Sequence, residues 1–137
     1  MALSASSHYR DRMDAGITLA RLLDMPGVAA RLHDLILDPE DTAVTRWTVD
    51  ALVRRGDGPA LAVVADTLPF VDDARLDWIV AGFLDALPLS SDWEAIATAC
   101  QMLPASNNAT MLCDLVASLH SPKPAGLSST RSGQLPA

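Results

Sequence analysis

DTAVTRWTVDALVRRGDGPALAVVADTL, residues 41–68, is followed by a related stretch, DDARLDWIVAGFLDALPLSSDWEAIATAC, residues 72–100. Matching positions lie 31 residues apart in the first half and 32 apart in the second half, after one extra residue in the intervening loop. A repeat of about 20–50 residues is typical of stacked units, each of which completes its core against its neighbour. The matching pairs are Asp41 with Asp72, Trp47 with Trp78, Val49 with Val80, Leu52 with Phe83, Leu61 with Trp93, Val64 with Ile96, Ala65 with Ala97 and Leu68 with Cys100.

Apolar residues recur at three- and four-residue spacing within each stretch, which predicts amphipathic helices. Asp41 or Thr42 is a favourable N-cap, as is Asp72 or Asp73 one repeat later. Gly56 is a favourable helix end, and Ser91 with Glu94 matches a capping box. Prolines follow most of the predicted helices, because the residue before a proline avoids the α conformation. The predicted helices cover residues 14–24, 28–38, 42–55, 58–68, 73–87, 91–103 and 107–120.

Composition also favours an all-α fold. Half of the 137 residues are apolar, yet only six are aromatic, and Leu, Ala and Val dominate. This balance suits helix packing better than a sheet. We therefore expect a flexible N-terminus over residues 1–13, one helical repeat domain over 14–120, and a disordered Ser/Pro/Gly-rich tail over 121–137.

The stretch from residue 35 to residue 68, with its motif DPEDTAVT…ALVRRGD, resembles the short HEAT-like proteins of high-GC bacteria. The resemblance covers roughly residues 14–103, although the unit is shorter than an ordinary HEAT repeat. It implies a short right-handed α-solenoid of about three antiparallel helix pairs, followed by a C-terminal helix, with a compact orthogonal array of the same helices as the alternative. It also implies a protein-binding scaffold, and it transfers no catalytic residues.

Charge and hydropathy indicate the kind of partner. The net charge is −7, carried almost wholly by fifteen Asp, so nucleic acid and anionic membranes are disfavoured as partners. A basic protein would be attracted, although the charge also serves to keep an apolar-rich chain in solution. No apolar run is long enough to span a bilayer, and residues 1–12 lack the apolar core of a signal peptide, so we expect a cytoplasmic location.

The residues expected to contact a partner lie in the central repeat. The acidic candidates are Asp72, Asp73 and Asp77, which occupy the start of one predicted helix. The basic candidates are Arg54 and Arg55, which also complement the negative end of the preceding helix dipole.

The tryptophans and cysteines are first interpreted as core residues. Trp47 and Trp78 share a register of 31 and should both be largely buried, as should Trp93. Cys100 lies on an apolar helical stripe, where a thiol is inert. Cys100, Cys113 and His120 match no zinc pattern.

Three functions remain open from the sequence. The first is a non-catalytic protein-interaction module without cofactor, in which the helices around 58–68 and 91–103 line one face. A narrower alternative is an immunity-type or antitoxin-like protein that neutralises a basic toxin. An alternative of another class is a small enzyme or metal protein using Cys100, Cys113 and His120.

Overall fold

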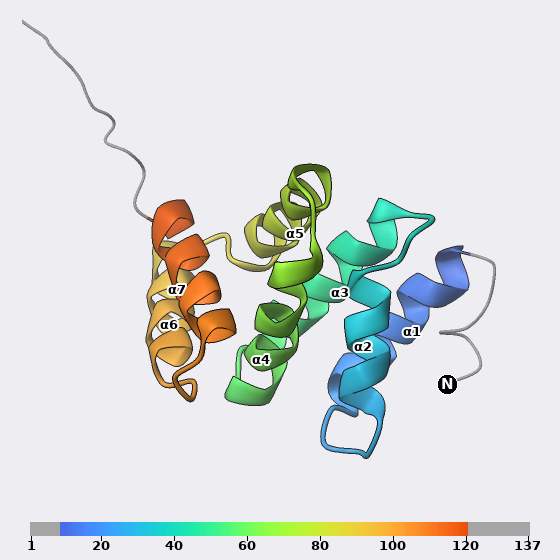
Figure 1. Cartoon of the computed structure of the whole chain (residues 1–137), viewed down its shortest axis with the longest axis horizontal. Helices are drawn as coiled ribbons and strands as arrows, with labels where there is room; N and C mark the ends of the chain where they lie inside the picture. Colours follow the sequence, from blue (N-terminus) through green and yellow to red (C-terminus); the bar gives the residue numbers. More distant parts are fainter. Residues whose placement is uncertain (1–8, 121–137) are drawn as a thin grey trace, which may run out of the picture.

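The structure, a computed structural model, describes residues 9–120, and this part of the chain is all-α (Figure 1). The predicted N-terminal residues 1–8 and the predicted tail 121–137 lie outside the described residues. The elements are α1 (Tyr9–Arg21), α2 (Val28–Ile36), α3 (Thr42–Arg55), α4 (Gly58–Thr67), the short 3-10 helix η2 (Leu68–Phe70), α5 (Asp73–Ala86), α6 (Ser90–Gln101) and α7 (Asn107–His120).

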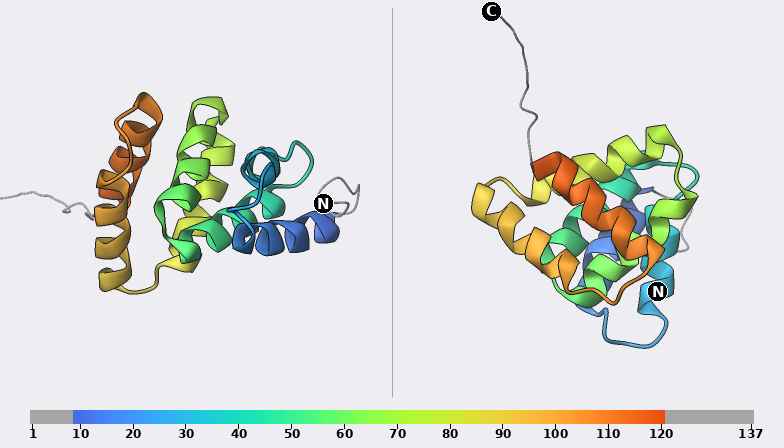
Figure 2. Two further views of the ribbon diagram at one scale, coloured as in Figure 1. Left: turned by 90° about the horizontal axis from the view of Figure 1, so that it is seen from below. Right: turned by 60° about the vertical axis from the view of Figure 1, so that its left-hand side comes forward.

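The helices form two layers, which the views of Figure 2 separate. In the first layer α3 lies between α1 and α5 and makes the most extensive contacts in the molecule. In the second layer α4 lies between α2 and α7. Helix α6 covers the end of the stack, where it packs against α7 and, less extensively, against α4.

Contacts between neighbouring helices of a layer join residues about one repeat apart. Arg75 on α5 donates to the hydroxyl of Thr45 on α3, 30 residues earlier, at 2.7 Å. In the second layer His33 Nε2 on α2 lies 3.3 Å from the carbonyl oxygen of Asp66 on α4, at a separation of 33. Near the end of α3, Arg54 likewise donates to the carbonyl of Asp85 near the end of α5 at 3.0 Å, so α3 and α5 run parallel. At the end of the second layer the relation is different, because Asn108 at the start of α7 donates to Asp66 near the end of α4 at 3.0 Å.

Two glycines bring the first-layer helices unusually close together. A methyl group added at Gly82 on α5 would lie 2.8 Å from the Arg46 carbonyl oxygen and 2.9 Å from Val49 on α3. A methyl group at Gly16 on α1 would lie 2.5 Å from the Thr48 hydroxyl, on another side of α3. The absence of side chains at these positions sets the spacing of the layer.

The predicted caps hold for most helices. Asp41 accepts a hydrogen bond from the Ala43 N–H at 2.8 Å, Asp72 accepts one from the Arg75 N–H at 2.8 Å, and Gly56 ends α3 with a φ of 71°. The predicted Ser91–Glu94 capping box is wrong. Helix α6 begins at Ser90, and it is the Asp92 carboxylate that accepts from the Leu89 N–H, at 3.1 Å.

One boundary prediction and one pairing prediction also need correction. The first helix begins at Tyr9 and ends at Arg21, so residues 9–13 are helical and not part of a flexible terminus. Its first turns are held by the buried Arg12, which donates to Asp38 at 2.6 Å, a contact that helical periodicity does not reveal. The expected pairing of the fifth and sixth helices is also wrong, because α6 packs chiefly against α7.

The core contains several of the matched residues. The matched residues Leu52 and Phe83 are fully buried, and Trp93 is 8 % exposed, with its indole N–H donating to the Leu87 carbonyl at 2.8 Å. Trp47 and Trp78, in contrast, are 40 % and 37 % exposed, so the prediction that both are largely buried is wrong. Helix α3 is covered by its neighbours on most sides, and its one uncovered strip includes Trp47.

Candidate partner-binding surfaces

A groove between the start of α5 and the middle of α7 combines an apolar floor with acidic edges. Its volume is about 480 Å³, and we name it the α5–α7 groove. Its apolar lining residues are Leu68, Val71, Leu76, Met111 and Leu115, and its polar lining residues are Asp72, Asp73, Asp114 and Ser118.

Local sequence explains how the groove forms. Pro69 ends α4 and turns the chain through η2, which contacts both α4 and α7. Asp72 is then fixed as the N-cap of α5, and Asp73 takes the first helical position. Met111, Asp114 and Leu115 belong to α7, more than 30 residues further along the chain. The groove therefore exists only because α7 packs beside α4.

The carboxylates at the edges of the groove lack an observed ion-pair partner, and two of them lie at the start of α5. Within residues 9–120, none of the observed ion pairs involves Asp72, Asp73 or Asp114. Asp72 uses one oxygen for its cap, and a second acceptor oxygen remains. Three carboxylates around an apolar floor make a site suited to cationic side chains on an amphipathic segment.

The acidic candidates from the sequence are thus only partly brought together. Asp72 and Asp73 line the α5–α7 groove, whereas Asp77 is exposed elsewhere on α5 and does not line it. Sequence reasoning missed Asp114. The only signal was its place beside Met111 and Leu115 on an amphipathic helix, and that signal does not reveal which neighbour α7 approaches.

The basic candidates are engaged within the molecule. Arg54 Nε donates to Asp50 at 2.8 Å, and its terminal nitrogen donates to the carbonyl of Asp85 at 3.0 Å. Arg55 donates to Asp57 at 2.9 Å, and this bond raises the pKa of the Arg55 guanidinium. Both arginines therefore join structural elements in addition to complementing the α3 dipole.

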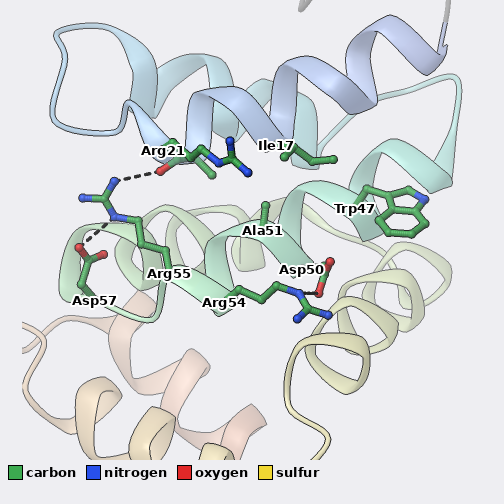
Figure 3. Close-up of a pocket in the computed structure, with 9 residues that line it drawn as sticks. Ile17, Arg21, Trp47, Asp50, Ala51, Arg54, Arg55 and Asp57 are labelled. Atoms are coloured by element: carbon green, nitrogen blue, oxygen red, sulfur yellow. Dashed lines mark hydrogen bonds and ion pairs between the residues drawn. The ribbon is translucent and has the colours of Figure 1, made fainter.

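Arg54 and Arg55 line a second groove, of about 570 Å³, which opens between α1 and α3 (Figure 3). We name it the Trp47 groove. Ile17 projects into it from α1, and Trp47 and Ala51 come from α3. Its remaining lining residues are Ala20, Arg21, Asp50 and Asp57.

Cys100 lies on α6, and Cys113 and His120 lie on α7. Burial, reinforced by the neighbouring Cys113, raises the pKa of the Cys100 thiol to about 12. His120 stacks on the indole of Trp93, with ring centroids 6.3 Å apart. Over residues 9–120 no three His, Cys, Asp or Glu side chains come together as a group that could hold a metal ion.

None of the helices between residues 9 and 120 has the length and apolar character needed to cross a membrane. No protein-family model, curated protein or solved structure matches the chain.

Proposed function

We propose that this chain is a short HEAT-like helical repeat protein that binds another protein and catalyses no reaction. Contacts at about one repeat's separation support the solenoid, since they occur in both layers. The glycine approaches on either side of α3 support it too, because regular stacking needs a constant distance between units.

The α5–α7 groove is the proposed docking site, and its partner is a basic amphipathic segment of a protein. Apolar side chains of that segment would cover Leu76 and Met111, and its Lys or Arg side chains would pair with the carboxylates of Asp72, Asp73 and Asp114. The observation that carries the proposal is the group of three carboxylates without ion-pair partners beside an apolar floor. The net charge of −7 would add long-range attraction.

A toxin with a basic domain is one partner of this chemistry, and an immunity-type role is the narrower form of the proposal. In that case the chain should inhibit the toxin in proportion to the complex formed. Inhibition should be weakened by the same substitutions that weaken binding.

The test compares two variants that change the net charge equally. Asp72→Asn, Asp73→Asn and Asp114→Asn together neutralise the groove, and Asn at position 72 retains a good cap. The control neutralises exposed carboxylates outside the groove, Asp14→Asn, Asp34→Asn and Glu94→Gln. Proteins captured by the wild-type chain from a native lysate are identified by mass spectrometry. Each purified candidate partner is then titrated against the wild-type chain, the groove variant and the control variant.

We expect a basic partner whose affinity falls in the groove variant and changes little in the control. Its association rate should also fall with added salt, since steering is screened over about 8–10 Å. An acidic partner, or equal loss of affinity in both variants, would contradict the proposed docking site.

A further inference from the structure

Residues 121–137, which we name the basic tail, are opposite in charge to the rest of the chain. The basic tail contains Lys123 and Arg131 and no Asp or Glu, a net charge of +2. Residues 1–120 hold the other eight basic residues and all seventeen acidic ones, a net charge of −9. Leu127 and Leu135 alternate with the two basic residues at intervals of four. The basic tail therefore combines the positive charge and the apolar side chains that the α5–α7 groove is suited to bind.

The basic tail also begins beside the groove. Helix α7 supplies groove residues from Met111 to Ser118, a length of about 10 Å, and it ends at His120. The eleven residues from His120 to Arg131 can span at most about 36–40 Å. This reach is several times the length of the α7 side of the groove, so the basic tail is long enough to fold back along it.

The arginines that the structure describes are not available to the groove. Most of them already have a partner within the molecule. Those with partners are Arg12, Arg31, Arg46, Arg54, Arg55 and Arg75. Arg21 takes part in none of the observed ion pairs, but it lines the Trp47 groove. Lys123 and Arg131, in contrast, directly follow a helix that forms one side of the α5–α7 groove.

We propose that the basic tail occupies the α5–α7 groove of its own chain until a partner displaces it. Lys123 and Arg131 pair with the groove carboxylates, and the apolar side chains of the tail cover part of the floor. The inference rests on the docking site proposed above and adds a means of regulating it. A tethered segment is present at its site at an effective concentration in the millimolar range, so even weak attraction keeps the groove occupied.

The first test measures whether the basic tail approaches α5. A nitroxide spin label is attached to the full 15N-labelled chain through Ser129→Cys, with Cys113→Ser, and the buried Cys100 is left unlabelled. At low salt we expect the label to broaden the amide signals of residues 71–76, more than 50 residues away along the chain. Added salt should remove the broadening, because it screens the charges. The groove variant should lose it as well, whereas the control variant, which changes the net charge equally, should keep it.

The second test measures competition for the groove. Lys123→Gln with Arg131→Gln should release the basic tail. The matched control is Arg21→Gln with Ser91→Asp, at exposed positions outside the groove, because it changes the net charge by the same amount. The probe is a helical peptide with Leu on one face and Lys on the other. A groove that is open for a quarter of the time binds about fourfold more weakly, so the tail variant should bind the peptide about fourfold more tightly than its control.

The outcomes separate this inference from the docking site on which it rests. Equal broadening in the groove variant and the wild type, or equal peptide affinity in the tail variant and its control, would overturn the inference; a peptide bound in the groove would still support the docking site. Broadening that depends on the groove carboxylates, in a chain whose tail variant binds no peptide, would support the inference and contradict the proposed function. Broadening found only between a spin-labelled chain and a separate 15N-labelled chain would make a second copy the occupant and overturn the inference.

Discussion

Gly82 sets the distance between α3 and α5. The Arg46 carbonyl oxygen, 2.8 Å from where a methyl group would lie, belongs to the backbone of a central helix and cannot rotate away. Gly82→Ala must therefore push the two helices apart. We expect a loss of about 1–3 kcal/mol in the free energy of unfolding, the usual cost of overpacking, measured by urea denaturation.

Gly58→Ala is the control for this substitution. The nearest atom to a methyl group there is Leu103 Cδ2 at 3.9 Å, an ordinary contact, and the position is the first of α4. Alanine should be neutral or stabilising by up to about 1 kcal/mol. Equal stability of the Gly82→Ala protein and the wild type would show that the first layer is not closely packed.

Cys100 gives a prediction about chemical reactivity. Its pKa of about 12 leaves almost no thiolate at neutral pH, and its side chain is buried. A Cys113→Ser variant removes the contribution of Cys113 but keeps the burial that is the largest cause of the raised pKa, so Cys100 should still react slowly with a thiol reagent in the folded state and rapidly in denaturant. Its native rate should keep rising with pH well beyond pH 9. Rapid native labelling at neutral pH would instead favour a reactive thiol and reopen the enzymatic alternative.

At the scale of single elements, the cap residues determine where helices begin. Asp72 serves both as the N-cap of α5 and as an edge of the α5–α7 groove. Asp72→Ala removes both roles and should cost about 0.5–2 kcal/mol of stability. Asp72→Asn should preserve stability, because Asn also caps well, but it should lower the affinity for the proposed partner. Thermal denaturation of the two variants separates the roles, and equal destabilisation by Asn and Ala would refute this division.

The pair that joins α3 to α5 gives stability a pH dependence. The hydrogen bonds from Arg46 lower the pKa of Asp85 below its ordinary value. Because the pKa of Asp85 is lower in the folded state, its pair with Arg46 stabilises the fold at pH values above the unfolded-state pKa of about 3.9. This stability is lost as the pH falls through the folded-state pKa. Asp85→Asn should therefore lower the melting temperature at pH 7 more than at pH 2.5. An equal effect at both values would show that the charge contributes nothing.

Most element boundaries could be read from the sequence, because their causes are local. Asp41, Gly56 and Asp72 act on the backbone within a few residues, and each lies where expected. The first helix was misplaced because its early turns depend on Arg12 reaching Asp38, a contact across 26 residues. Trp47 was misjudged for a related reason. Helical spacing shows that it shares a side with Ala51, but not that this side remains uncovered.

At the scale of the whole molecule, the candidate site could be predicted only in part. Asp72 and Asp73 were found from charge and position, whereas Asp114 joins them through the packing of α7 beside α4. The repeat predicts which helices are equivalent, and it fails at the end of the stack. There, α6 packs against α7, so α7 takes the place beside α4. Surfaces formed by such a terminal arrangement depend on the tertiary structure.

The central claim is that the α5–α7 groove docks a basic amphipathic segment, and backbone amide NMR of the 15N-labelled chain measures this most directly. The probe is a helical peptide with Leu on one face and Lys on the other. We predict shift changes concentrated at residues 71–76 and 111–118, reduced by salt and abolished by the Asp72, Asp73 and Asp114 substitutions together. Shifts spread evenly over exposed carboxylates such as Asp14 and Glu94, or unaltered in that triple variant, would contradict the claim.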